Sequence, residues 1–389
     1  MSLISDTKTL EAFCQRQTGA SFLTVDTEFM RESTFWPKLC LLQVGGPEEA
    51  AAVDALAPGI DMNPLFDLLF DERILKVFHA ARQDLEIFFH LKGRLPKPVF
   101  DTQVAAMVCG FGEQVGYETL IAKTTKAKID KSSRFTDWSL RPLNERQIHY
   151  ALSDVTHLRP AYEKLTHKLS ASGREKWIEE EMSVLTSLET YSVDPKNAFR
   201  RIKAKGSKPR FLAILREVAA WREEEALKRD VPRNRVIRDE ALIEIAHHKP
   251  ASVKDLARTR GLGQKMAEGR NGELILAAVE RGLAVADSDC PKPVDKPDLP
   301  RGIGPITDLL KVMLKMKCED FDVAPKLIAS SSDLDLIAAF GENADVRAMR
   351  GWRRDVFGDD ALRLRTGDMA LAVTNRKVQV VELNRKEED

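Results

Sequence analysis

The chain has 389 residues, of which 43% are hydrophobic and 31% charged, a balance typical of a protein that folds into two or three globular domains. No apolar run approaches the roughly 20 residues of a membrane span, and the first residues lack the basic and apolar regions of a signal peptide. The formal net charge is zero, and five scattered cysteines without a Cys-x-x-Cys pair argue against a disulfide framework or a structural zinc site. We therefore expect a cytoplasmic protein with reduced thiols.

Charge is unevenly distributed along the chain. Residues 1–200 hold 24 Lys and Arg against 28 Asp and Glu, residues 201–286 hold 19 against 12, and residues 287–389 hold 17 against 20. The net charges are therefore −4, +7 and −3. The basic middle segment predicts a module that binds a polyanion, although an imbalance of this size also arises by chance.

Residues 20–110 mix strand and helix patterns. Strands are expected at residues 21–27, 38–44, 50–55, 74–78 and 98–101, and helices at 80–92 and 102–109. From about residue 117 to 190 the pattern is mostly helical. This order predicts an α/β domain with one central mixed sheet, which we assign to residues 1–200.

The remainder of the chain predicts only helices. A charged, glycine-containing stretch at 200–209 is typical of a linker. Short helices are expected at 210–229, 239–246, 252–259 and 263–281, within an all-α domain at residues 207–286. The Pro- and Asp-rich residues 287–300 predict a second linker, residues 301–375 a second helical domain, and residues 376–389 a polar, frayed tail.

Asp26 and Glu28 lie one residue apart in an apolar run of strand-forming residues. Side chains alternate across a strand, so both carboxylates point to the same face. Two like charges on a buried strand are costly to desolvate, and a divalent cation between them removes that cost. An Asp-x-Glu pair alone is a weak signal, because such pairs are common.

Two later helices add further polar side chains. Asp84 falls in the first turn of the helix expected at 80–92, where an acid also favours the helix dipole without any catalytic role. Tyr150 and Asp154 are spaced i, i+4, which places both on one helix face. The alternative for this pair is a half-buried tyrosine beside a solvated aspartate.

In this order, the four acids and the tyrosine resemble the DEDD exonuclease superfamily, in its tyrosine-containing subclass. The resemblance narrows to the ribonuclease D family on the sequences of residues 25–32, 35–37, 41–43, 99–103, 136–143 and 150–155. It implies an α/β, ribonuclease H-like exonuclease domain with a central mixed sheet. Residues 210–286 resemble an HRDC domain at 215–223, 230–239 and 261–266, and residues 301–375 would be a second, weaker HRDC-type domain.

The resemblance also implies the chemistry. Two divalent ions, Mg²⁺ or Mn²⁺, would clamp the attacking and leaving oxygens of one phosphate, and hard oxygen ligands suit these ions. Asp26 would bridge both ions, Glu28 and Asp154 would complete one ion site, Asp84 would reach the other, and Tyr150 would orient the attacking water. The expected activity is 3′-to-5′ exoribonuclease action on RNA with 3′ extensions, chiefly tRNA precursors, releasing nucleoside 5′-monophosphates.

Several other residues are candidates for RNA contact. Phe35 and Trp36 could stack on a terminal base, although aromatic residues in this position more often belong to a core. His79 is expected to serve packing or backbone bonding ahead of substrate contact, and Asp101 with Thr102 to cap a helix. Candidates for phosphate contacts are Arg134, Arg229, Arg233, Arg235 and Lys265.

Two other functions remain open at this point. The first is a DNA 3′-to-5′ exonuclease, because no motif visibly reads a 2′-hydroxyl. The second is an inactive RNA-binding adapter, which predicts loss of a carboxylate, whereas all four are present. A monomer without an obligate protein partner is expected.

Overall fold

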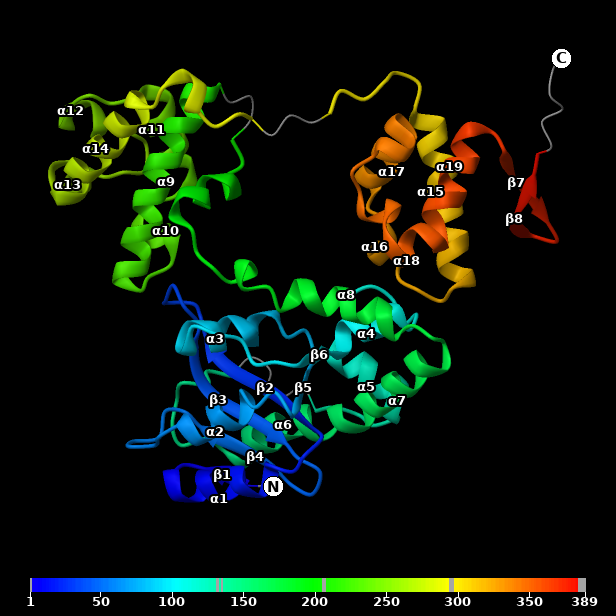
Figure 1. Cartoon of the computed structure of the whole chain (residues 1–389). Helices are drawn as coiled ribbons and strands as arrows, with labels where there is room; N and C mark the ends of the chain where they lie inside the picture. The colour runs from blue at the N-terminus through cyan, green and yellow to red at the C-terminus, as the bar shows by residue number, and fades with distance from the viewer. Residues whose placement is uncertain (1, 131–132, 134–135, 205–207, 294–296, 384–389) are drawn as a thin grey trace, which may run out of the picture.

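The computed structural model describes residues 2–130, 133, 136–204, 208–293 and 297–383. Figure 1 shows an α/β domain with two helical bodies on one side of it. The strands of its six-stranded sheet are β1 (Ser2–Ile4), β2 (Phe22–Met30), β3 (Lys38–Gly45), β4 (Ala50–Asp54), β5 (Leu75–Phe78) and β6 (Val99–Asp101).

The sheet is mixed, as predicted. Its spatial order is β1-β4-β3-β2-β5-β6. Strand β2 is central, antiparallel to β3 and parallel to β5. The edge strand β1, parallel to β4, was not anticipated, because three residues are too few to show an alternating pattern.

Helices cover both faces of the sheet. On one face lie α1 (Thr7–Gln17), α2 (Asn63–Leu69) and α3 (Arg82–Lys92), over a core that includes Leu23 and Val25 of β2. On the other lies α6 (Glu145–Thr156), packed on Leu41 of β3. Beyond the β6 edge come α4 (Thr102–Val108), α5 (Tyr117–Thr125), α7 (Leu158–Ala171) and α8 (Glu175–Leu185).

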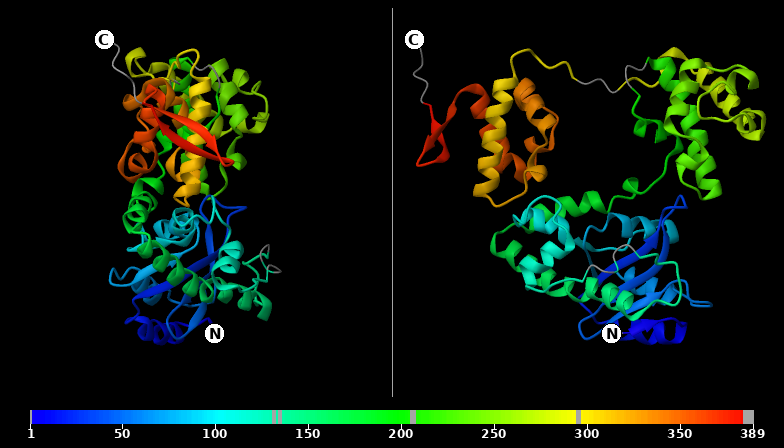
Figure 2. Two further views of the ribbon diagram at one scale, coloured as in Figure 1. Left: turned by 90° about the vertical axis from the view of Figure 1, so that its right-hand side faces the viewer. Right: turned by 180° about the vertical axis from the view of Figure 1, so that it is seen from behind.

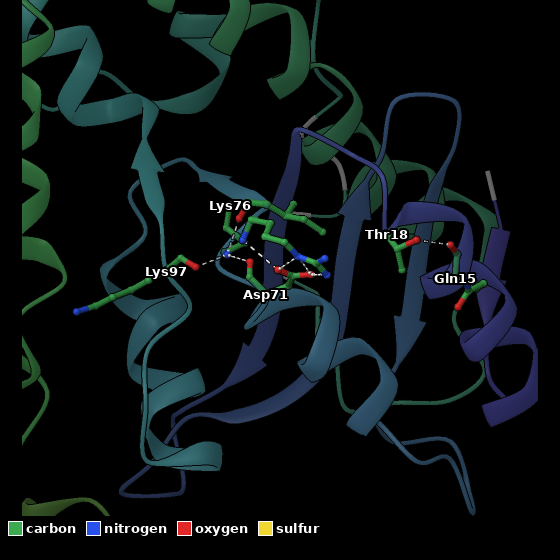
Figure 3. A network of polar contacts seen from close by, with 7 residues as sticks. Gln15, Thr18, Asp71, Lys76 and Lys97 are labelled. Carbon is green, nitrogen blue, oxygen red and sulfur yellow. Dashed lines mark hydrogen bonds and ion pairs between the residues drawn. The ribbon is translucent and has the colours of Figure 1, made fainter.

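A buried lysine secures the start of β5. The Lys76 ammonium donates hydrogen bonds to the carbonyls of Asp71 (2.8 Å), Ile74 (2.6 Å) and Lys97 (2.5 Å). Figure 3 shows this network, and also the Thr18 hydroxyl donating to the Gln15 carbonyl at the end of α1. Three donors meet three acceptors, so the buried charge is solvated by backbone and the β5–β6 edge is held firmly.

The first helical body contains α9 (Pro209–Arg229), α10 (Arg233–Val236), α11 (Asp239–His248), α12 (Val253–Leu256), α13 (Gln264–Glu268) and α14 (Arg270–Ala284). The helix expected at 263–281 is wrong as a single element. It is broken at Gly269, whose extended backbone (φ −93°, ψ −178°) separates α13 from α14. The helix expected at 252–259 shortens to α12.

The second helical body contains α15 (Gly304–Asp320), α16 (Pro325–Ile328), α17 (Ser331–Phe340), α18 (Gly351–Arg353) and α19 (Asp359–Thr366). The chain then forms a hairpin of β7 (Met369–Thr374) and β8 (Lys377–Glu382), so the predictions of purely helical structure up to residue 375 and of a frayed tail from residue 376 are wrong there. The reason is local. Alternating apolar residues flank Asn375 and Arg376, whose positive φ values (52° and 65°) suit a tight two-residue hairpin turn.

The two bodies attach to the α/β domain differently. The second shares one continuous apolar core with it, in which Leu310 and Met313 join Ala105 and Leu165. The first takes Phe35 of the α/β domain into its own core, and Asp230 accepts hydrogen bonds from the Phe35 and Trp36 amides at 3.0 and 3.2 Å. Figure 2 shows from behind that the two helical bodies lie apart from each other, both on the same side of the α/β domain.

These helices give no evidence of a membrane span. None of those within the described residues is both long enough and apolar enough to span a bilayer.

Candidate active site

The site is built around β2. Asp26 pairs in register with Gln43 and Glu28 with Leu41, and a register shift follows directly between Glu28 and Phe29. The two carboxylates share a sheet face, as predicted, and both are half-buried. Asp154 of α6 joins them, and one ligand oxygen from each of the three acids lies within 4.8 Å of the others. We call Asp26, Glu28 and Asp154 the acidic cluster.

Helix α6 is placed by its own start and by a glycine beneath it. Asn144 and Gln147 form a capping box that fixes the first turn. A Cβ at Gly45 of β3 would meet the Thr24 hydroxyl at 2.4 Å and the Val155 carbonyl at 3.1 Å, so only glycine lets α6 approach this closely. The Thr24 hydroxyl also donates to the Val155 carbonyl at 2.8 Å. Asp154 therefore reaches the sheet on a rigid support.

The carboxyl pKa values of the acidic cluster are raised, as expected for acids that have no cation beside them. Burial, then the charges of Asp26, Asp154 and Asp84, raise the pKa of Glu28 to about 10. Burial raises the pKa of Asp154 to about 7, partly offset by a hydrogen bond from Tyr150, and it raises that of Asp26 well above its usual value. No lysine or arginine within the described residues forms an ion pair with the three acids. Carboxylate oxygens are preferred ligands of Mg²⁺ and Mn²⁺, so this donor set fits a divalent cation.

Asp84 lies close by but outside the acidic cluster. It begins the buried face of α3, and its Oδ1 accepts a hydrogen bond from the Thr27 hydroxyl at 2.5 Å. Burial, followed by the charge of Asp26, raises the pKa of Asp84 well above its usual value. The predicted fourth carboxylate is therefore within electrostatic reach of the others but turned toward Thr27.

Asp101 positions the turn that leads to Asp84. Its carboxylate accepts hydrogen bonds from the amides of Ala80 and Ala81 at 2.9 Å and of Gln103 at 2.8 Å. Asp101 is the N-cap of α4, so its predicted capping role is confirmed. It also holds the left-handed Ala80 (φ 61°) just before α3. Asp101 acts on the site through the backbone.

Tyr150 lies one turn before Asp154 on α6, and its hydroxyl hydrogen-bonds to that carboxylate. Its ring stacks on Trp138, with centroids 6.2 Å apart. The loop carrying Trp138 is held by Arg141, which forms an ion pair with Asp54 (2.6 Å) and donates to the Trp138 and Leu140 carbonyls. The segment 136–143 therefore supports the tyrosine.

Sequence reasoning missed Tyr117 and Thr27. The hydroxyl of the half-buried Tyr117 donates to the carbonyls of Ser153 (3.0 Å) and Asp154 (2.7 Å) and so fixes the end of α6. Its position in an ordinary amphipathic helix gave no signal. Thr27 lies between Asp26 and Glu28, and this position was the only feature of the sequence that could have pointed to it.

The structure places the candidate RNA-contact residues of the α/β domain mostly in packing roles. Phe35 is 4% exposed and Trp36 stacks on His90 with ring centroids 4.5 Å apart. His79 Nδ1 lies 3.0 Å from the Thr102 hydroxyl, and burial lowers the pKa of His79. These placements match the core and bonding alternatives, and Arg134 lies outside the described residues.

The candidates in the first helical body divide into two kinds. Arg233 is committed to Glu223 by two hydrogen bonds, and its guanidinium also lies 4.3 Å from the Phe35 ring centroid. Arg229 lies 3.8 Å from Glu225. Arg235 and Lys265 are exposed and form no ion pair with a residue that the structure describes, so they are available to a polyanion.

Comparison with known proteins matches both parts of the chain. Residues 1–170 match the family described as 3′-5′ exonuclease, and residues 211–279 match the HRDC domain. The ribonuclease D of Jannaschia sp. (strain CCS1) is 50% identical, over 98% of this chain and 99% of that protein. The ribonuclease D of Granulibacter bethesdensis is 47% identical, over 98% and 96%.

Solved structures agree with these matches. Escherichia coli RNase D, described as an exoribonuclease involved in structured RNA processing, has a TM-score of 0.80 at 29% identity, covering 94% of this chain and 98% of that one. A protein from Bifidobacterium adolescentis shares the fold, with a TM-score of 0.66 at 20% identity over 94% and 97% of the two chains.

Proposed function

The chain belongs to the ribonuclease D family of 3′-5′ exoribonucleases, and from that premise we propose that Asp26, Glu28, Asp84, Tyr150 and Asp154 carry the hydrolysis. The family is dependent on divalent metal, and a DNA-specific exonuclease is not favoured. The observation that carries the residue assignment is the acidic cluster, one buried and two half-buried acids whose oxygens converge within 4.8 Å and form no ion pair with any cationic side chain of the described residues.

The acids would serve as ligands for two ions, Mg²⁺ or Mn²⁺. When bound, these ions would neutralise the scissile phosphate and activate the attacking water. Asp26, on the central strand β2, would serve as a ligand of both ions, and Glu28 and Asp154 would be further ligands of one of them. Asp84, oriented by the hydrogen bond from the Thr27 hydroxyl, would complete the other side.

Tyr150 would orient the attacking water. Its hydroxyl already hydrogen-bonds to Asp154, and its ring is held against Trp138. A fixed donor beside the ligand acids can align water for in-line attack, which reduces the entropic cost of the reaction. Attack at phosphorus breaks the bond to the 3′-oxygen of the upstream nucleotide, which takes a proton, and releases a nucleoside 5′-monophosphate.

For the substrate, we propose RNA with 3′ extensions, chiefly tRNA precursors, acted on by a monomer. The support is family membership and the basic first helical body, net +7 over residues 201–286. Residues 301–375 are proposed as a second HRDC-type domain, on the similar number and size of their helices.

The test is hydrolysis of a tRNA with a 3′ extension, labelled at its 5′ end, in Mg²⁺ or Mn²⁺. We expect a ladder that shortens by single nucleotides and is absent with chelator and in Asp154→Ala. Equal or faster shortening of DNA of the same sequence would contradict the choice of RNA. Tight binding without shortening in either metal would contradict the assignment of hydrolysis.

A further inference from the structure

A cleft of about 390 Å³ lies between the α/β domain and the first helical body. Its lining includes four arginines and two aromatic residues, which are Arg31, Arg82, Arg201, Arg233, Phe35 and Tyr191. Arg31 follows β2 and Arg82 begins α3, whereas Arg201 precedes α9 and Arg233 begins α10. Both sides of the junction therefore contribute positive charge to one space.

The arginines are not equally neutralised. Arg31 forms a two-bond ion pair with Glu86 (2.6 and 3.0 Å), and Arg233 pairs with the buried Glu223. Arg201 is 63% exposed and lies 3.9 Å from the same Glu223. Arg82 is exposed and forms no ion pair with any residue within the described part of the chain. The cleft therefore has surplus positive charge, centred on Arg82 and Arg201.

The cleft is lined in part by the same two elements of the α/β domain that carry acids of the proposed reaction site, since Arg82 begins α3 and Arg31 follows β2. Arg82 is two residues before Asp84, and Arg31 is three residues after Glu28. A phosphodiester strand that approaches buried acids is repelled by them, so fixed positive charge beside the site lowers the cost of bringing it in.

We propose that this cleft holds a backbone phosphate of the RNA strand upstream of the scissile bond. The proposal rests on the proposed function and adds to it the path of the strand. Guanidinium groups bind phosphate through paired N–H donors, and Arg82 and Arg201 have these donors free or weakly engaged.

The aromatic residues in the cleft explain why the contact should be with phosphate and not with a base. Phe35 is covered by the Arg233 guanidinium, 4.3 Å from its ring centroid. Tyr191 is 4% exposed, and its hydroxyl donates to the Leu185 carbonyl at 2.8 Å. Neither ring offers a free face for stacking, so the cleft should bind RNA without regard to sequence.

The test compares two unstructured oligoribonucleotides, a dinucleotide and a ten-nucleotide strand. The dinucleotide has only the scissile phosphodiester and cannot reach an upstream site. Removing one charged hydrogen-bonding group at a bound phosphate weakens binding by about tenfold. We expect Arg82→Ala to raise KM for the longer strand about tenfold more than for the dinucleotide, with a further rise when Arg201→Ala is added.

Salt gives an independent readout. Removing an arginine that binds a phosphate should make the fall of log(1/KM) with log[salt] shallower by about 0.7 for a single strand. The matched control is Arg73→Ala, an exposed arginine before β5 that pairs with Asp71 at 2.6 Å and lies outside the cleft. It should change neither the ratio of the two KM values nor the salt slope.

Three results would overturn the proposal. These are equal losses on both lengths in Arg82→Ala, no loss on either, or the same change in Arg73→Ala. If the unaltered protein hydrolyses neither oligoribonucleotide in Mg²⁺ or Mn²⁺, the proposed function itself fails. If it hydrolyses both and Arg82→Ala leaves the ratio of KM values unchanged, only the cleft proposal fails.

Discussion

Two groups of carboxylates in this chain have opposite electrostatics. Near α18, Glu180 and Glu181 receive the guanidinium of Arg353, whose side chain is fully buried and also donates to the Leu327 carbonyl. In the acidic cluster, Asp26, Glu28 and Asp154 receive no cation from the described part of the chain. Both groups carry the cost of desolvating charge, and only the first has its own means of offsetting it.

The difference indicates what each group is for. The first group contains its own cation, Arg353, and joins α8 to the second helical body. It lies beside the stacked Trp177 and Trp352 rings, whose centroids are 4.1 Å apart. A group without a cation keeps raised carboxyl pKa values and is stabilised when an external cation arrives. The group that contains Arg353 should therefore govern the stability of the protein, and the acidic cluster its activity.

The largest expected effect is the loss of activity in Asp154→Asn. Removing one ligand charge should lower kcat/KM by at least about 10³-fold, or roughly 4 kcal/mol of transition-state stabilisation. The same change removes repulsion from the metal-free cluster, so unfolding by urea in chelator should require more denaturant. Asp355→Asn, at an exposed position of the second helical body, is the matched control and should change neither quantity. If Asp154→Asn unfolds at a lower urea concentration than the unaltered protein, the idea that the metal-free acids repel one another is wrong.

Arg353→Met should have the opposite profile. It removes the hydrogen bonds that the buried guanidinium donates to Glu180, Glu181 and the Leu327 carbonyl, and the loss of hydrogen bonds to charged groups should cost about 1.5–3 kcal/mol of unfolding free energy. The folded fraction should still hydrolyse RNA, because Arg353 lies far along the chain from the acidic cluster and touches none of its acids. Urea unfolding measures the loss.

The control for that change is Arg350→Met. Arg350 is 72% exposed and pairs with the exposed Asp345, so its loss should cost less than about 1 kcal/mol. Equal costs for the two variants would show that the buried pair does not anchor the second helical body.

The sequence predicted which residues would lie together at the candidate site better than it predicted the contacts that support them. The order Asp26, Glu28, Asp84, Tyr150 and Asp154 was readable because a short motif on a strand and an i, i+4 pair on a helix are local patterns. The capping of α4 by Asp101 was readable for the same reason.

The supports depend on contacts between distant segments. Gly45 and Thr24 lie more than 100 residues before the Val155 carbonyl that they approach, and no local pattern announces such a contact. The hairpin at 369–382 was missed because helical spacing in the preceding segment was extended past Gly367, which ends α19 in a left-handed conformation. The anchoring role of Arg353 required knowledge of which residues face it from α8.

A smaller effect is expected from pH and divalent metal together. Raised carboxyl pKa values mean that the folded, metal-free protein holds protons that the unfolded chain releases. This contribution to stability is complete below about pH 4, the ordinary carboxyl range, and for Asp154 it is lost as the pH rises through about 7. Mg²⁺ binds the deprotonated acids and should restore stability by about 2.7 kcal/mol at 100 times its Kd.

The measurement is thermal unfolding in Mg²⁺ and in chelator across that pH range. The gap between the two curves should widen with rising pH in the unaltered protein and stay small in Asp154→Asn. A gap that narrows as pH rises would mean that the acidic cluster is already ionised without metal.

The smallest expected effect concerns Thr27, whose hydroxyl donates a hydrogen bond to Asp84. Thr27→Val keeps the shape of the buried side chain but removes the donor to Asp84, and loss of such a supporting hydrogen bond typically weakens metal binding by about tenfold. Thr27→Ser keeps the hydroxyl and should bind Mg²⁺ as the unaltered protein does. Calorimetric titration of Mg²⁺ separates this effect from a loss of stability, which urea unfolding reports. Tighter Mg²⁺ binding in Thr27→Val would reverse the assignment, because Thr27 would then restrain Asp84 from the metal and not orient it.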